Sequence, residues 1–172
     1  MRPSKQVLET AEAIDRGFRG GAYTPALQTE KEKHKPWYAL FLTTLTATAA
    51  GGEIIWAQMQ YRKTDNEAFF TVLTADIVIV AHAEAVHLDE PLVTVRAFGR
   101  KSLAAIEVHT DQAINDTSSA ALAWPGNVRV AANYWTPENE VVVFVASDKA
   151  SDASKEAPVL RLLAELAKDL NS

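Results

Sequence analysis

Four short runs of apolar and β-branched residues, separated by turn residues, occupy the middle of the chain. They cover residues 69–74, 77–81, 92–98 and 103–109, with Asp76 and Gly99 among the residues that separate them. Runs of this length and composition are typical of strands, and short polar breaks are typical of tight turns. The pattern therefore predicts an antiparallel meander in which successive strands pair as hairpins.

A different pattern at each end of the chain predicts an amphipathic helix. Apolar residues recur there every third or fourth position, as expected when one face of a helix packs on a core. They are Val7, Ala11, Ile14 and Phe18 in residues 5–19, and Val159, Leu162, Leu163, Leu166 and Leu170 in residues 158–170. Ser4 is a suitable N-cap for the first helix, Gly20-Gly21 would end it, and Pro158 suits the first turn of the second.

Residues 38–48 are apolar but rich in threonine, which favours a strand because β-branched side chains lose χ1 freedom in a helix. Gly51-Gly52 would then form a hairpin loop, and residues 53–62 would return as the next strand. Alternation along that return strand places one apolar set toward the core. The set is Ile55, Ala57, Met59 and Tyr61.

A further hairpin is predicted from residues 128–135 and 140–146, because Thr136-Pro137-Glu138-Asn139 has the residues that a turn needs. The complete order is a helix, about seven strands and a C-terminal helix. We expect an N-terminal helical extension over residues 1–50 and one mainly β domain over residues 51–172.

Two segments resemble the bacterial pleckstrin-homology-like (PH-like and GRAM-like) domains. Residues 70–80 read FTVLTADIVIV and resemble that family's strand, "LT-D" turn and strand; residues 98–108 read FGRKSLAAIEV and resemble its next hairpin. The likeness spans Glu53 to Leu170. It implies a partly open antiparallel barrel of about seven strands, capped by the C-terminal helix. It also implies a non-catalytic interaction module that binds a protein partner or a membrane phospholipid headgroup.

Charge is distributed unevenly along the chain. Residues 1–35 carry seven basic and five acidic residues, whereas the remainder carries ten and seventeen, for a total of −5. Because residues 36–172 carry a net negative charge, they should repel phosphate backbones, and we expect no nucleic-acid binding. The longest apolar run, residues 37–50, is too short to span a membrane. The lack of cysteine and of a signal peptide ahead of the first helix fits a cytoplasmic protein.

Arg96, Arg100 and Lys101 form the strongest basic cluster in the acidic part of the chain, and in the resembling family loops near such hairpins meet headgroups or protein partners. The alternative is that they solubilise a loop or pair with Glu90 or Glu107. Trp135, beside a predicted turn, is the tryptophan expected to be partly exposed and to take part in a partner or self-association contact. These four residues are our candidate binding residues.

Catalytic and metal-binding patterns are weak. Two predicted strand faces carry His and acidic residues, with His87 nearby, but without a spaced ligand motif. The residues are His82 and Glu84 on one strand, and Glu107, His109 and Asp111 on the other. No serine lies in the context of an activated nucleophile, and neither Gly-Gly pair is long enough to cradle a phosphate. We therefore predict no enzyme activity, metal or cofactor.

Two alternatives to the PH-like module remain open. One is a small-molecule-binding α+β cone of the NTF2-like kind, with enzymatic activity in some forms, which would enclose a deep apolar pocket. The other is a homo-oligomer with a mainly structural role, in which a sheet edge or the N-terminal segment pairs with a second copy.

Overall fold

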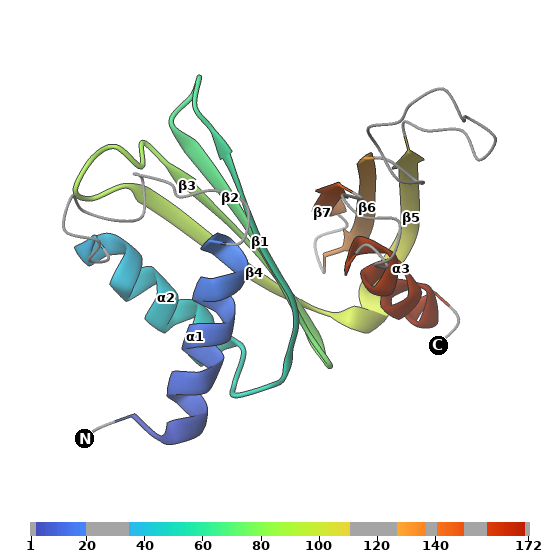
Figure 1. The fold of residues 1–172 in the computed structure, drawn as a ribbon, viewed down its shortest axis with the longest axis horizontal. Coiled ribbons are helices and arrows are strands. Elements are labelled where there is room, and N and C mark those ends of the chain that lie inside the picture. The colour runs from blue at the N-terminus through green and yellow to red at the C-terminus, as the bar shows by residue number, and fades with distance from the viewer. Residues whose placement is uncertain (1–2, 20–34, 111–126, 137–140, 150–157, 171–172) are drawn as a thin grey trace. The chain divides into compact units, whose positions relative to one another are not determined.

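The computed structural model describes residues 3–19, 35–110, 127–136, 141–149 and 158–170. Within these ranges the chain is an α+β protein with seven strands in two antiparallel sheets (Figure 1). Its elements are α1 (Lys5–Arg19), α2 (Pro36–Thr48), β1 (Ile54–Arg62), β2 (Glu67–Thr74), β3 (Ile77–Glu84), β4 (Leu92–Gly99), the 3₁₀ turn η1 (Arg100–Ser102), β5 (Leu103–Thr110), β6 (Asn127–Trp135), β7 (Val141–Lys149) and α3 (Pro158–Asp169). They form two compact units, residues 1–99 and residues 100–172.

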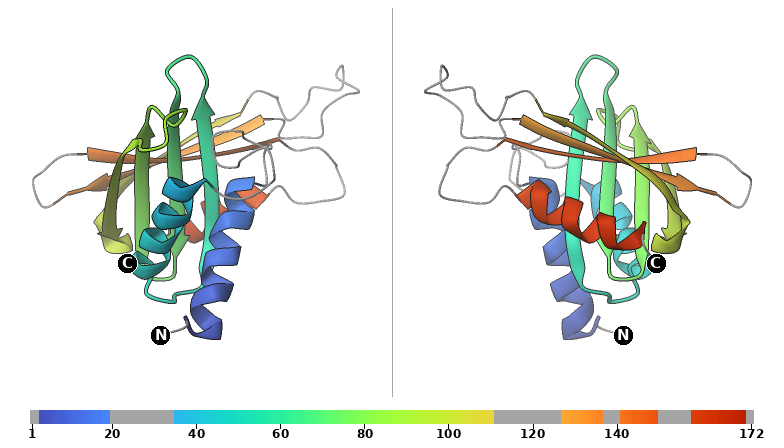
Figure 2. Two further views of the ribbon diagram at one scale, coloured as in Figure 1. Left: turned by 90° about the vertical axis from the view of Figure 1, so that its left-hand side faces the viewer. Right: turned by 90° about the vertical axis from the view of Figure 1, so that its right-hand side faces the viewer.

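Unit 1, residues 1–99, is a four-stranded antiparallel sheet in the order β1-β2-β3-β4, with α1 and α2 on one face (Figure 2). Side chains alternate between the two faces of a strand, so every second residue of β2 points toward the helices. Phe70 lies opposite Met59 of β1 and Ala81 of β3, and Val72 lies two positions further along β2. These residues belong to the core beneath the helices.

Aromatic side chains occupy the centre of that core. The Phe70 ring lies 5.0 Å from the ring of Phe18 on α1 and 4.6 Å from the ring of Phe41 on α2, measured between centroids. Phe70 is fully buried, and the other two are at most 4% exposed. Aromatic pairs at such separations contribute about 0.5–1.5 kcal/mol each beyond the area that they bury. The three rings therefore join both helices to the sheet.

Helix α1 confirms the prediction from its apolar spacing. The Ser4 Oγ accepts a hydrogen bond from the Val7 backbone N–H at 3.3 Å, which is the predicted N-cap contact. Ile14 and Phe18 are buried, and so is Asp15. The Asp15 carboxylate accepts a hydrogen bond from the Tyr38 hydroxyl at 2.8 Å and forms an ion pair with Arg19. The predicted helix end at residues 20–21 lies outside the described residues.

The prediction of a strand over residues 38–48 is wrong, because this segment is helix α2. Pro36 occupies the first turn, where its missing N–H costs nothing. Each threonine hydroxyl then donates to the carbonyl four residues earlier. The bonds run from Thr43 to Ala39, Thr44 to Leu40, Thr46 to Leu42 and Thr48 to Thr44, at 2.7–3.2 Å. With the hydroxyls satisfied inside the helix, packing of Tyr38, Phe41 and Leu45 on the sheet outweighs the β propensity of threonine.

Strand β1 is confirmed, but it pairs with β2 and not with the segment before it. Ala57, Met59 and Tyr61 face the helices as predicted. A register shift between Ile54 and Trp56 changes the alternation at the start of the strand. As a result Ile54 packs against the core where the sequence pattern placed Ile55.

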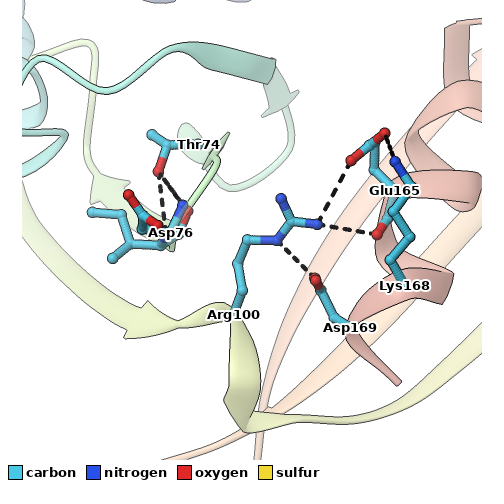
Figure 3. Close-up of polar contacts among 7 residues, drawn as sticks. Thr74, Asp76, Arg100, Glu165, Lys168 and Asp169 are labelled. Carbon is cyan, nitrogen blue, oxygen red and sulfur yellow. Dashed lines mark hydrogen bonds and ion pairs between the residues drawn. The ribbon is translucent and has the colours of Figure 1, made fainter. Parts of the chain in front are cut away.

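The predicted turn between β2 and β3 is also confirmed. The Thr74 Oγ accepts hydrogen bonds from the backbone N–H groups of Asp76, at 3.3 Å, and Ile77, at 3.1 Å (Figure 3). A threonine hydroxyl used in this way closes a tight turn and fixes where the next strand begins. The β2–β3 and β3–β4 hairpins then follow in order along the sheet.

Unit 2, residues 100–172, is a three-stranded antiparallel sheet in the order β5-β6-β7 together with α3. Strand β6 is the central strand, and its Val128, Val130 and Tyr134 are buried. Helix α3 confirms the predicted C-terminal helix and buries Val159, Leu162 and Leu166, whereas Leu170 at its end is 46% exposed. The middle of the predicted hairpin turn, residues 137–139, lies outside the described residues.

The meander does not continue from β4 to β5, which corrects the prediction that residues 69–109 form four strands paired in succession. These two strands belong to different sheets, and η1 lies between them. The seven described strands therefore lie in two sheets, and the partly open seven-stranded barrel that the resemblance implies is not seen in the described residues. The expected division at residue 50 also differs from the observed one between Gly99 and Arg100, because α1 and α2 supply much of the core over which β1–β4 are arranged.

Candidate binding groove

An open groove of about 860 Å³ lies in unit 1 between α2, β4 and the loop that precedes β4. Its lining is mostly apolar, with two carboxylates. The lining residues are Pro36, Trp37, Leu40, Phe41, Thr44, Asp89, Glu90, Pro91, Val93 and Val95. The volume is within the range of about 300–1,000 Å³ that is usual for ligand sites.

The two walls follow from the periodicity of their elements. On α2, the lining residues recur at Pro36, Leu40 and Thr44, four positions apart, which is one side of a helix. On β4, Val93 and Val95 are two positions apart and share the face that carries the helices. Both valines are only partly buried, so apolar surface lines the groove on either side.

The α2 wall has no charge. Residues 36–52 contain neither an acidic nor a basic side chain, and Leu40 is 70% exposed. The indole Nε1 of Trp37, a buried groove residue, has no hydrogen-bond partner in the described part of the chain. A helix that is apolar all round is normally covered by other structure. The exposed side of α2 is thus the kind of surface on which a further element packs.

The carboxylates lie at the loop end of the groove. Asp89 and Glu90 are exposed, and neither forms an ion pair with the residues that the structure describes. No lysine or arginine occurs between Lys63 and Arg96. The nearest basic residue in sequence to the α2 wall, Lys35, donates from Nζ to the Val86 carbonyl at 3.4 Å. This end of the groove therefore presents negative charge.

Arg100, one of our four candidate binding residues, lies inside unit 2. Its side chain is 9% exposed; Nε donates to the Asp169 Oδ2 at 2.7 Å, and Nη2 donates to the Glu165 carbonyl at 3.0 Å (Figure 3). Nη2 also lies 4.0 Å from the Glu165 carboxylate. This burial corrects the expectation that Arg100 shares an accessible basic loop with Lys101. The guanidinium instead joins η1 to α3.

The other three candidates lie at the surface. Lys101 is exposed beside Arg100, and Arg96 is exposed on β4 of unit 1. Trp135, at the end of β6, is 50% exposed, in agreement with the partial exposure expected of it. Lys101 and Trp135 belong to unit 2. A binding role for these three residues stays a prediction.

A stack of side chains occupies the face of the unit 1 sheet opposite the helices. The rings of Phe69 and His82 are parallel at 4.5 Å, and the Arg62 guanidinium lies 5.0 Å from the Phe69 centroid. The His82 nitrogens lie 3.5 Å from the Glu67 carboxylate and 3.7 Å from the Glu84 carboxylate. These contacts account for the His82–Glu84 pair that the sequence singled out.

Within the described ranges, no group of three or more His, Asp or Glu residues is placed to hold a metal ion. On β5, His109 Nε2 lies 3.9 Å from the Glu107 carboxylate, and both side chains are largely exposed. Asp111, the third residue of that predicted set, lies outside the described residues.

Among the described residues, the pKa values of two phenols and one carboxyl are shifted, and none of the three side chains lines the groove. Burial, followed by the hydrogen bond and charge of Asp15, raises the pKa of Tyr38 far above its ordinary value. Burial, followed by the charge of Asp169, does the same to the pKa of Tyr134. The hydrogen bond from Lys168 lowers the pKa of Glu165.

Comparison with known proteins leaves the chain without an assigned family. No protein-family model matches it, and no curated protein matches its sequence. None of the helices in the described part of the chain is both long and apolar enough to cross a membrane.

The sequence pattern does not indicate the groove, because one wall of the groove is α2 and the pattern predicts a strand for that segment. A signal was present in the absence of charge over residues 36–52 and in the proline that begins the segment. It indicates burial on several sides, but it does not distinguish a helix from a strand.

Proposed function

We propose that this protein is a non-catalytic interaction module of the PH-like class that binds a protein partner through the groove between α2 and β4. The observation that carries the proposal is the groove itself, an exposed apolar surface with Leu40 at its wall and two carboxylates at one end. Contiguous exposed apolar surface rimmed by polar residues marks interaction sites on proteins.

The order of elements supports the PH-like class. Seven strands are followed by a C-terminal helix that buries Leu162 and Leu166, which is the order of elements that the resemblance implies. Helix α2 lies outside the stretch that carries the resemblance, and it forms the groove together with β4 and the loop before it. The binding surface that we propose thus depends on a helix that precedes that stretch.

Charge favours a protein over a phospholipid headgroup. Asp89 and Glu90 would repel a phosphate from the groove, and Arg100 is engaged by Asp169 and Glu165. A headgroup site would depend on Arg96 or Lys101. Lys101→Glu and Arg96→Glu variants, tested with vesicles containing anionic lipid, measure this alternative; vesicle binding that either change abolishes would favour the headgroup.

A second candidate function is favoured by the size of the groove. Its volume and apolar lining also suit a small apolar molecule with a cationic group, which corresponds to the NTF2-like alternative. A thermal-shift screen of amphiphilic amines against the full chain tests it. A rise in Tm that Leu40→Glu removes would favour a small ligand.

The test of the leading proposal places a photo-crosslinking amino acid at position 40 in the native cell. The matched control carries it at position 92, because Leu92 is about as exposed as Leu40 but points to the other face of the sheet from Val93. We expect a protein crosslinked from position 40 and not from position 92. The purified partner should then lose affinity for Leu40→Glu. No crosslink, or the same one from both positions, would contradict the proposal.

A further inference from the structure

We infer that the partner segment taken by this groove is an amphipathic α-helix, with leucine-like residues on one face and lysine or arginine at the end that meets Asp89 and Glu90. The inference rests on the proposed function and names the chemistry of the partner.

The first argument comes from the outer surface of α2. Ala39, Leu40, Thr43 and Thr44 are all exposed, and the two threonine hydroxyls are satisfied by the helix's own carbonyls. What remains for a partner is mostly methyl and methylene surface. Of these residues, Leu40 and Thr44 line the groove, and their spacing of four positions lets a second helix pack along them.

The second argument comes from the shape of the site. A helix with its side chains is about 10–12 Å across, so one helix lying in the groove would contact the Leu40 side of α2 and the valines of β4 together. A strand added to β4 would instead lie in the plane of the sheet and leave the groove residues Leu40 and Thr44 in water. Helix α2 has 13 residues, and a partner helix of similar length, about 20 Å, would cover it.

The third argument comes from charge. With Asp89 and Glu90 unpaired among the described residues and no lysine or arginine from residue 64 to residue 95, the loop end of the groove attracts cations. A second copy of the chain placed with its own groove against this one would bring two more carboxylates and repulsion. Lysine or arginine on a helix of another protein would instead pair with Asp89 and Glu90. Charge therefore favours a different protein as the partner over a second copy of this chain.

Two synthetic peptides of identical composition test the inference on the full chain. The first is an 18-residue peptide with leucine at helical spacing and lysine elsewhere; the second alternates leucine and lysine, which suits a strand. Both carry a fluorophore, and binding is followed by fluorescence anisotropy at 50 mM and 500 mM salt. We expect the helical peptide to bind at least about tenfold more tightly than the alternating one.

Three protein variants locate the binding. Leu40→Glu, at a wall of the groove, should lower the affinity for the helical peptide about tenfold or more. Leu92→Glu should change that affinity by less than about twofold. The double change Asp89→Lys and Glu90→Lys should weaken it about tenfold in 50 mM salt and much less in 500 mM salt, because salt screens exposed charges. Circular dichroism is the control for folding. We expect each variant to be folded, because residues 40, 89, 90 and 92 are all exposed.

Each other outcome overturns the inference. Tighter binding of the alternating peptide would make the partner a strand. Equal effects of Leu40→Glu and Leu92→Glu would mean that the peptide binds elsewhere. Light scattering that shows a dimer abolished by Leu40→Glu would make the groove a self-association surface. The crosslinking experiment does not depend on helicity, so a crosslinked protein without helix binding would leave the proposed function in place and remove only the helix.

Discussion

The two units of this protein are stabilised by different means. In unit 1 the aromatic rings of Phe18, Phe41 and Phe70 hold two helices on a four-stranded sheet. In unit 2 the buried side chain of Arg100 donates hydrogen bonds to two groups on helix α3, the Asp169 carboxylate and the Glu165 carbonyl. The larger unit thus depends mainly on apolar contact at its centre, to which buried Asp15 adds a polar contact with Tyr38 and Arg19. The smaller unit adds the ion pair of Arg100 to its apolar packing.

The difference is consistent with size. A smaller unit buries a smaller share of its surface, so apolar packing alone supports it less well. A guanidinium with two acceptors on α3 also fixes the position of that helix, which leucines alone define less strictly. The comparison predicts that unit 1 is sensitive to lost volume and unit 2 to lost charge.

The largest effect is expected from Phe70→Ala, which removes the ring that joins both helices to the sheet. Phe70 is fully buried, so the free energy of unfolding should fall by about 4 kcal/mol. Denaturant titration measures the loss, and hydrogen exchange should show it in β1–β4. Phe69→Ala is the control, because Phe69 is only half-buried on the opposite face, and it should cost about 1 kcal/mol. Equal losses of stability in Phe70→Ala and Phe69→Ala would contradict the central role of the Phe70 ring in the core of unit 1.

Arg100→Ala should cost about 3 kcal/mol, because it leaves the largely buried Asp169 carboxylate without its cation. Faster hydrogen exchange in β5 and β6 would locate the loss in unit 2. The neighbouring exposed Lys101→Ala should cost less than about 0.5 kcal/mol. The double change Arg100→Met and Asp169→Leu should recover part of the stability, since no buried charge then remains unpaired. If Arg100→Ala and Lys101→Ala behave alike, the polar contact does not stabilise unit 2.

Alkaline titration compares the two units through one buried tyrosine in each. Because burial raises the pKa of both Tyr38 and Tyr134, these phenols stay neutral in the folded protein while the unfolded chain ionises near 10.0. Their contribution to stability is fully present below pH 10 and is lost as the pH rises above it. Absorbance at 295 nm should show at least two tyrosines, Tyr38 and Tyr134, ionising only on unfolding. Tyr38→Phe and Tyr134→Phe should each reduce that number by one; ionisation before unfolding would contradict the burial.

The smallest effect concerns Glu165 on α3. The hydrogen bond from Lys168 lowers the pKa of Glu165 below its ordinary value of 4.5, so the contact stabilises the folded state above that pH and is lost as the pH falls. Carboxyl NMR titration of Lys168→Ala should show the pKa of Glu165 returning toward 4.5. An unchanged pKa would mean that another cation, such as Arg100 at 4.0 Å, controls this carboxyl.

Helices α1 and α3 could be predicted from the sequence because each has one apolar stripe on an otherwise polar surface. Helix α2 has no such contrast, because its exposed side is as free of charge as its buried side. Without that contrast the threonines decided the prediction, and their hydrogen bonds to the helix's own carbonyls cannot be read from residue type. The groove was missed with the helix.

The separation of β4 from β5 and the burial of Arg100 also escaped prediction. Gly99-Arg100-Lys101-Ser102 has the composition of a hairpin turn, and composition does not tell whether the strands on either side pair with each other. The partner of Arg100, Asp169, is 69 residues away in the chain. Contacts at that separation depend on how the three strands and α3 come together, and no local pattern in the sequence records it.

Gly17 determines how closely α1 packs on the first strand of the unit 1 sheet. A β-carbon at this position of α1 would lie 2.5 Å from both the Cβ and the carbonyl oxygen of Ala57 on β1. The bare glycine therefore lets α1 rest directly on the outermost strand, and even an alanine would lift the helix away. One hydrogen atom in place of a methyl group thus sets the spacing between α1 and the sheet, on which the contact of the Phe18 and Phe70 rings depends.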